Sequence, residues 1–298
     1  FTQKTASEML RSLVGSEMCI RDRGISLLHA LGLGKGCSVG IDLTTRASIV
    51  EGPNRDVLEY NKRLLDAVIS VWTSEGLPSP DEYYWEIESN VPIGQGLKSS
   101  SALACAALRA LNSVSWTGLS DNEIADLAVS AQKLAKCTLT GSMDDAWASL
   151  SSGWRLVDPT LPASQSVLLE GLIEDGLEVL IGLRGGRKNP PTIENFSGNK
   201  HLFERPLASL VSGSPLEALS SNGMAVAAST EDFEALRICN HSIASGAIAA
   251  GVSGSGPAVA VVCYESDLNK LAELFSDWGL GTICTRFSDS ESVVEEVH

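Results

Sequence analysis

The strongest constraint on the fold comes from residues 91–111, VPIGQGLKSSSALACAALRAL. The stretch begins as a loop rich in glycine and serine. It continues as a helix that is apolar on nearly every side, with Arg109 as its only charge. Such a helix is stable only when other elements surround it. The sequence therefore predicts a helix buried in the core, whose N-terminus is held rigidly behind a glycine-rich loop.

The start of this helix has the chemistry of a phosphate-binding site. Free backbone N–H groups and the positive end of the helix dipole attract anions, and Gly94 and Gly96 let the backbone approach a ligand closely. Lys98 adds a positive charge, and the hydroxyls of residues 99–101 can bond phosphate oxygens or ligate Mg²⁺. A glycine-rich turn with a serine N-cap is the structural alternative. The loop is not a Walker A sequence, because GxxxxGK[ST] is absent.

Composition limits the classes of ligand and location. The 298 residues include 22 Lys and Arg against 37 Asp and Glu, a net charge of −15 at pH 7. Nucleic-acid binders usually present a basic surface, so that class is disfavoured, and the apolar stretches are too short for a membrane span. The seven cysteines form no CxxC pair or zinc spacing, which indicates reduced thiols in a cytoplasmic protein. An anion site in so acidic a chain must depend on local dipoles and a lysine.

The pattern along the chain mixes strands and helices without regular βαβ alternation, which favours an α+β fold. Strands are expected at 39–50, 83–88, 177–183, 259–264 and 282–287, and helices from residue 54, from Ser120 and over 267–278. Ser120 and Glu123 form a capping box. A Pro- and Ser-rich segment at 158–166 marks a domain boundary. Residues 1–23 resemble translated adapter sequence and are expected to be a non-native or disordered N-terminus without function.

Two further motifs carry candidate site residues. TGSMDDA places Asp144 and Asp145 side by side after a glycine turn. Phosphoryl transfer to a hydroxyl needs a carboxylate that accepts or orients the proton, although aspartates are also common in turns and N-caps. On extended backbone, adjacent side chains point to opposite sides, so only one carboxylate is expected to face a reacting atom. AGVSGSGPAVAVV places Gly254, Ser255 and Gly256 before an apolar strand, where a plain turn is the alternative.

In their order and residues, these motifs resemble those of the GHMP kinases. PIGQGLKSSSA is similar to the family pattern Pro-x-x-x-Gly-Leu-x-Ser-Ser-x-Ala, and a lysine before three serines is typical of archaeal-type shikimate kinases. The family loop wraps the phosphates of ATP, and the third motif shapes the site. The resemblance implies nucleotide contacts from Pro92, Gly94, Gly96, Leu97, Lys98, Ser99, Ser100, Ser101, Gly254, Ser255 and Gly256, with Ser100 also a Mg²⁺ ligand.

The same resemblance assigns roles outside the loop. It implies that Asp144 is the catalytic base and that Asp145 is an orienting or substrate-binding group. The carboxylate ligand of Mg²⁺ is left unassigned, because Gln132 and Lys133 stand where many family members have a glutamate. Residues 24–46 are similar to the N-terminal motif of the shikimate kinases, which implies substrate contacts from His29 and Lys35. A core histidine and a solvated turn lysine are the alternatives.

The resemblance covers residues 24–298 and implies a two-domain fold. A domain like the second domain of ribosomal protein S5 is expected over 24–160, and a ferredoxin-like domain over 166–298, with ATP and substrate between them. The implied activity is phosphorylation of the 3-hydroxyl of shikimate in aromatic amino-acid biosynthesis. The alternatives are a mevalonate- or homoserine-type kinase and a degenerate ATP-binding paralogue without activity. Homoserine enzymes generally lack the catalytic aspartate, and mevalonate enzymes rarely carry the loop lysine. The oligomeric state is left open.

Overall fold

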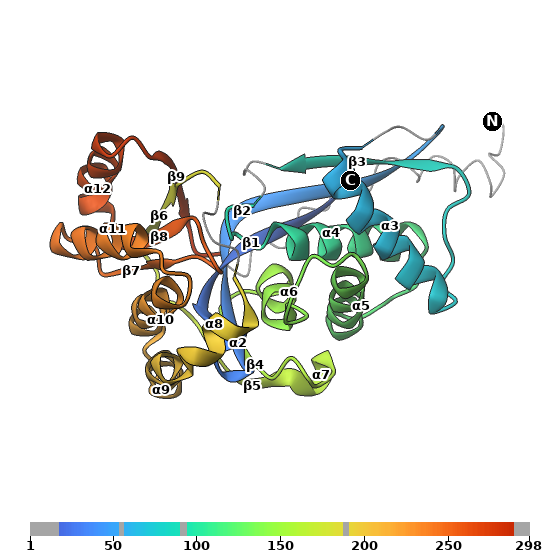
Figure 1. Ribbon diagram of the computed structural model, residues 1–298. Helices are drawn as coiled ribbons and strands as arrows, with labels where there is room; N and C mark the ends of the chain where they lie inside the picture. The colour runs from blue at the N-terminus through green and yellow to red at the C-terminus, as the bar shows by residue number, and fades with distance from the viewer. Residues whose placement is uncertain (1–17, 54–56, 90–93, 187–190, 289–298) are drawn as a thin grey trace.

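A computed structural model describes residues 18–53, 57–89, 94–186 and 191–288 (Figure 1). The first half of the chain forms an antiparallel sheet around one long strand. That strand, β2 (Gly36–Glu51), pairs with β1 (Met18–Leu28), β3 (Tyr83–Ser89) and β4 (Trp154–Val157). β5 (Val167–Gly171) then pairs with β4, which gives the order β1-β2-β4-β5 with β3 also on β2. The strands expected at 39–50 and 83–88 are therefore confirmed, the first with a longer extent.

Helices α3 (Glu59–Ser74), α4 (Ser99–Val114), α5 (Asp121–Leu134) and α6 (Met143–Leu150) pack in this half of the molecule (Figure 1). The prediction of a buried helix after the glycine loop is confirmed, because α4 is buried continuously from Ser101 to Leu108. α4 contacts β1 and β2 on one side and α3, α5 and α6 on the others. The capping box at the start of α5 is also confirmed, with Ser120 and Glu123 bonded reciprocally.

The second half forms a four-stranded antiparallel sheet in the order β7 (Ala249–Val252), β8 (Val259–Tyr264), β6 (Leu177–Leu183) and β9 (Gly281–Arg286). The longer helices here are α10 (Pro215–Ser229), α11 (Phe233–Ala244) and α12 (Glu265–Asp277). The shorter ones are α8 (Ile193–Gly198), η1 (Lys200–Phe203) and α9 (Glu204–Val211). Two further short helices lie earlier in the chain: α2 (Ala30–Leu33) between β1 and β2, and α7 (Ala163–Ser166) between β4 and β5. The strands expected from sequence at 177–183, 259–264 and 282–287 correspond to β6, β8 and β9.

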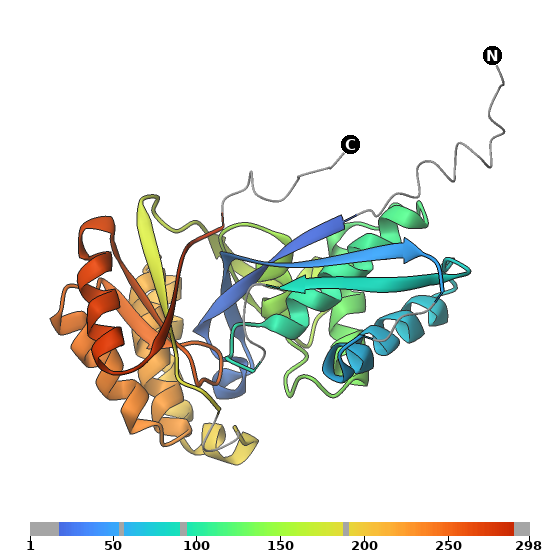
Figure 2. The ribbon, with the colours of Figure 1, turned by 90° about the horizontal axis from the view of Figure 1, so that it is seen from above.

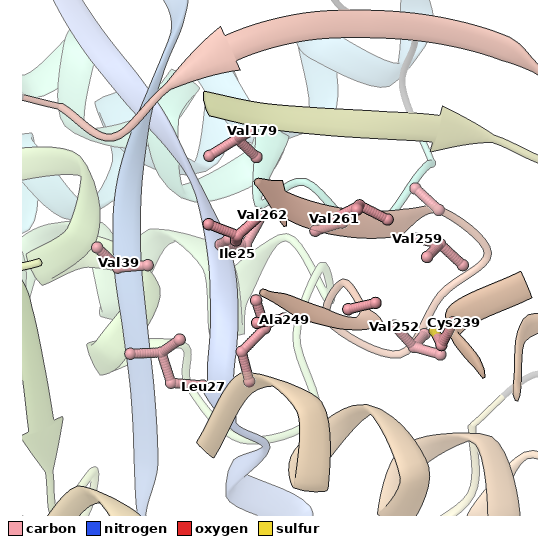
Figure 3. Packing of buried hydrophobic residues seen from close by; sticks show 14 of the residues in the cluster. Ile25, Leu27, Val39, Val179, Cys239, Ala249, Val252, Val259, Val261 and Val262 are labelled. Carbon is pink, nitrogen blue, oxygen red and sulfur yellow. The ribbon is translucent and has the colours of Figure 1, made fainter. Parts of the chain in front are cut away.

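The two halves lie side by side and share buried apolar surface (Figure 2). Ile25 and Val39 of the first sheet belong to the same cluster as Val179 and Val262 of the second sheet (Figure 3). A β-bridge from Ile41 to the residue after β9 adds a backbone connection. Because both sheets contribute to one core, the relative position of the loops at their junction is fixed by packing.

Two boundaries in the structure, the one between the halves and the one at the N-terminus, differ from those expected from the sequence. The chain returns to the first sheet as β5 after the Pro- and Ser-rich segment, so it crosses to the second sheet only after Gly171. Proline and serine mark a turn there, but the sheet continues beyond that turn. At the N-terminus, β1 begins at Met18, so the last residues of the 1–23 segment pair with β2. Residues 1–17 lie outside the described part.

Within the described ranges, no helix combines the length and apolarity that a membrane span requires. The cysteines described at positions 37, 105, 137, 239, 263 and 284 are all free thiols.

Candidate active site

The glycine loop ends at the N-terminus of α4 in backbone conformations that suit close ligand approach. Gly94, Gly96 and Lys98 have φ values of 83°, 79° and 60°. Lys98 is the N-cap residue and makes no capping bond with its side chain, so the helix does not begin with the serine N-cap of the structural alternative. The first N–H groups of a helix lack intrahelical partners. This end of α4 therefore retains the donors and dipole that an anion needs.

The third motif packs directly on this loop. Ser253 Oγ donates a hydrogen bond to the Gly96 carbonyl over 2.9 Å, and the Ala258 N–H donates to the Gln95 carbonyl over 3.2 Å. A Cβ at Gly96 would lie 2.3 Å from the Ser253 carbonyl oxygen, and one at Gly254 would lie 2.8 Å from the Gly96 carbonyl oxygen. Glycine is therefore required on both sides of the contact, because any side chain there would separate the two loops.

A cavity of about 390 Å³ opens where these loops meet. It brings together most of the residues expected in the site. Its walls include Gly94, Gly96, Leu97, Lys98, Ser99, Ser100, Gly254 and Ser255, together with His29, Asp144 and Asp145. Ser101 and Gly256 support the loops from behind: the Ser101 hydroxyl donates to Gln132, and the Gly256 N–H donates to the Ser253 carbonyl. Pro92 lies outside the described residues.

Both aspartates reach the cavity, which differs from the expectation that only one would. They lie in the first turn of α6 rather than on extended backbone, so their side chains do not point to opposite sides. Lys98 forms an ion pair with Asp145, and its Nζ lies 4.0 Å from Asp144 Oδ2. The Ser38 hydroxyl donates to Asp144 Oδ2 over 2.7 Å and lies 3.2 Å from Asp145 Oδ1. Ser38 and Lys98 thus hold the two carboxylates together.

The pKa values of the two carboxyl groups are shifted in opposite directions. Burial, followed by the negative charge of Asp145, raises the pKa of Asp144 to about 7, against the opposing effects of Lys98 and the Ser38 hydrogen bond. Burial also acts to raise the pKa of Asp145, but the charge and hydrogen bond of Lys98, together with a hydrogen bond from Asp144 and the charge of His29, lower that pKa below its usual range. At neutral pH, Asp145 is ionised, and Asp144 is poised to take up or release a proton.

His29 and Lys35 have different surroundings. His29 lines the cavity as the N-cap of α2, where its Nδ1 accepts from the Leu31 N–H over 3.3 Å. The backbone N–H of His29 donates to Asn222 Oδ1 over 2.9 Å, which ties α2 to α10. The Lys35 Nζ lies 3.9 Å from Asp158 Oδ2, and Lys35 is not among the residues that line the cavity.

Ser38 and Asn222 contact site residues but do not stand out in the sequence, and Gln132 is noted there without being assigned a role. Gln132 is fully buried in α5, and its Oε1 accepts from Ser100 over 3.2 Å and from Ser101 over 2.9 Å. This is the place in the sequence where the carboxylate ligand of Mg²⁺ was expected and could not be assigned. Ser38 and Asn222 carry no local signal, because their partners are 106 and 193 residues away in the chain.

Comparison with known proteins identifies the family. The family model described as the GHMP kinases N-terminal domain matches residues 62–153. The shikimate kinase of Thermococcus kodakarensis is 31% identical over 274 residues, which cover 86% of this chain and 94% of that protein. This chain belongs to the GHMP kinase family. The shikimate kinase of Methanobrevibacter smithii is also similar, with 27% identity over 84% of this chain and 88% of the relative.

Solved structures of GHMP kinases have the same fold. The mevalonate kinase of Methanococcus jannaschii aligns with a TM-score of 0.69 over 92% of this chain and 99% of that chain, at 16% identity. A putative homoserine kinase from Listeria monocytogenes aligns with a TM-score of 0.65 over 91% of this chain and 96% of that chain, again at 16% identity. The expected two-domain α+β GHMP fold is therefore confirmed. As a GHMP kinase, the protein is a phosphotransferase that uses ATP.

Proposed function

We propose that this kinase is a shikimate kinase, which transfers the γ-phosphoryl group of ATP to the 3-hydroxyl of shikimate. The observation that carries the proposal is the extent of the similarity to the Thermococcus kodakarensis shikimate kinase, 31% identity over 94% of that protein. The matched region spans 86% of this chain, so it includes parts of both halves that line the cavity. The mevalonate and homoserine kinases align at 16% identity, which bears on the fold alone.

Asp144 is the proposed base. Its carboxyl lines the cavity beside the phosphate loop, and its pKa of about 7 suits a group that takes a proton from a hydroxyl at neutral pH. In-line transfer to the acceptor oxygen leaves the protein mainly with positioning and charge stabilisation. The Ser38 hydroxyl fixes the orientation of the Asp144 carboxyl through the 2.7 Å hydrogen bond. Asp144 then receives the acceptor proton as the new oxygen–phosphorus bond forms.

Lys98 and Asp145 form the second part of the proposed machinery. The ion pair places the ammonium group of Lys98 at the start of α4, where the N-terminal N–H groups also lie. These donors would stabilise the negative charge on the transferring phosphoryl group. Asp145 would orient Lys98 and bond an acceptor hydroxyl. His29 is proposed as an acceptor contact because it lines the same cavity, whereas the assignment of Lys35 remains a prediction from sequence.

The residues at the loop suit Mg²⁺. Ser100 Oγ and Gln132 Oε1 lie 3.2 Å apart, and both are hard oxygen donors of the kind this ion prefers. Nowhere in the described residues, this loop included, do three His, Cys, Asp or Glu side chains converge as a metal-binding group. Both donors are neutral, so the remaining ligands would be nucleotide phosphates and water. When bound, Mg²⁺ would neutralise charge on the β- and γ-phosphates. A cytoplasmic location is part of this proposal and rests on the cysteine pattern.

A parallel acceptor assay tests the proposal. The full chain is incubated with ATP and Mg²⁺, and ADP release is measured with shikimate, mevalonate or homoserine as the acceptor. We expect turnover with shikimate, with shikimate 3-phosphate identified by mass spectrometry. Turnover with another acceptor and none with shikimate would refute the proposal. ATP binding without turnover on any acceptor would favour the degenerate paralogue.

The role of Asp144 has its own variant pair. Asp144→Asn should reduce kcat by at least about 1,000-fold, because it removes the proton acceptor. Asp42→Asn is the control, because Asp42 lies on the exposed side of β2 in the same sheet. The control should retain wild-type kcat. Full activity in Asp144→Asn would show that another group accepts the proton.

A further inference from the structure

Three helices in the described part of the chain end on a left-handed residue that is not glycine. Trp116 follows α4, Lys136 follows α5 and Glu231 follows α10, with φ values of 52°, 54° and 54°. In each case the next N–H bonds back to a carbonyl five residues earlier: Thr117 to Asn112, Cys137 to Gln132 and Asp232 to Ala227. This helix ending favours glycine at the left-handed position, because a Cβ there is crowded. The identity of each residue therefore needs another explanation.

Lys136 differs from the other two in its location. It lines the cavity with the phosphate loop and the aspartates, whereas Trp116 and Glu231 do not. It is exposed to solvent, so its ammonium group can reach a ligand. Residues held in an unfavourable backbone conformation at a ligand cavity are candidates for function.

The charges around the cavity leave Lys136 available to a ligand. Lys98 is already paired with Asp145 and lies near Asp144. No carboxylate in the described ranges forms an ion pair with Lys136. A ligand with several negative charges needs more positive charge than a lysine already neutralised by a carboxylate can supply. Lys136 can add that charge.

The end of α5 that carries Lys136 is connected to the phosphate loop. The last turns of α5 are tied to the phosphate loop, because Gln132 accepts hydrogen bonds from Ser100 and Ser101 at the start of α4. Lys136 follows Gln132 by four residues at the same end of α5. Its backbone is held by the N–H of Cys137, which bonds to the Gln132 carbonyl over 3.0 Å. Lys136 therefore lines the cavity from the end of α5 that is hydrogen-bonded to the serines of the phosphate loop.

We propose that Lys136 binds a phosphate oxyanion of the nucleotide and so acts as a binding residue of the kinase in addition to Lys98. The inference rests on nucleotide binding in this cavity and not on the identity of the acceptor. An acceptor carboxylate offers similar oxyanion chemistry, and the connection of this end of α5 to Ser100 through Gln132 favours the phosphate. The backbone cost of a left-handed lysine is then balanced by its contribution to ligand binding.

The test uses a substitution that should weaken ligand binding without lowering the stability of the fold. Lys136→Gly removes the charge and relieves the left-handed conformation. We expect the affinity for a non-hydrolysable ATP analogue, measured by calorimetry without acceptor, to fall about tenfold, the loss of one charge-assisted hydrogen bond. The melting temperature should stay unchanged or rise by about 2 °C. A lysine with a purely structural role would leave the affinity unchanged.

Two further variants serve as controls. Trp116→Gly makes the same backbone change at an exposed helix end outside the cavity, so the affinity should remain at the wild-type value. Lys136→Arg keeps the charge and should bind within about threefold of wild type. Wild-type affinity in Lys136→Gly would overturn the proposal. A raised acceptor KM with unchanged nucleotide affinity would also overturn it, because the contact would then be to the acceptor carboxylate. Failure of shikimate turnover would leave this binding test unaffected.

Discussion

Gly36→Ala should disable the enzyme by moving the catalytic carboxyl while leaving the fold intact. Gly36 is the first residue of β2, and an ideal Cβ there would lie 2.6 Å from both Cγ and Oδ1 of Asp144. Real Cβ contacts essentially never fall below 3.0 Å and are ordinary only from 3.4 Å. The carboxyl must therefore move by about 0.4–0.8 Å. Ser38 and Lys98 hold the carboxyl in its present position, so any such movement disturbs these contacts.

The displacement acts on a group whose position decides the rate. The Ser38 hydroxyl holds the carboxyl at 2.7 Å, and the movement would lengthen or break this bond. A misplacement of about 1 Å at a reacting centre costs roughly 100-fold in rate. We therefore expect kcat to fall by about 30- to 100-fold, which corresponds to about 2–3 kcal/mol of transition-state stabilisation. The strain of one extra methyl group should lower the stability by only about 1–3 kcal/mol.

Steady-state ADP release and thermal unfolding by circular dichroism measure the two effects. The KM for ATP should change by less than about twofold, because the substitution meets Asp144 and not the phosphate loop. Gly198→Ala is the control, since a Cβ there has no neighbour within 4 Å, and it should be silent in both measurements. A Gly36→Ala enzyme that folds and retains kcat within about threefold of wild type would refute the reasoning. In that case the observed position of Asp144 would not be the catalytic one.

Three other outcomes follow from the site. Ser38→Ala removes the hydrogen bond that favours the ionised form of Asp144, so the pKa of Asp144 should rise and the acid limb of the kcat/KM profile should move up by about one pH unit; an unmoved limb would exclude this role. Asp144→Asn should raise the melting temperature at pH 8. The folded pKa of about 7 exceeds the unfolded value near 3.8, so the wild type loses stability as the pH rises between these values; melting curves with identical pH dependence would contradict this. Gly96→Ala places a Cβ 2.3 Å from the Ser253 carbonyl and should weaken ATP binding more than tenfold by calorimetry, whereas Gly94→Ala adds left-handed strain but no contact and should be milder.

Much of the local structure follows from the sequence. The apolar pattern of residues 99–114 identifies α4 as a buried helix, because periodicity and burial are linked within a single element. Ser120 and Glu123 likewise predict the start of α5, since both bonds of a capping box join residues three apart. The motifs that carry the family resemblance are also local, and they place the phosphate loop before any tertiary contact is known.

The local sequence pattern did not predict which secondary structure follows a turn. The Pro- and Ser-rich segment predicts a boundary, but β5 follows it and pairs with β4. Asp144 and Asp145 follow a glycine turn, and the expectation of extended backbone there is wrong because α6 begins at Met143. Aspartate is favoured both in turns and in the first turn of a helix, so the residue type alone does not separate these cases.

The sequence by itself determined the helix, the glycine loop and the candidate aspartates, since these depend on residues close together in the chain. Only the tertiary structure decided which groups meet them. Ser38 reaches Asp144 across 106 residues of sequence, and Lys98 reaches Asp145 from the start of another helix. The raised pKa of Asp144 and the lowered pKa of Asp145 arise from burial and from charges brought together by folding. The proton chemistry of the site is therefore a property of the folded core, whereas the phosphate loop is already visible in the sequence.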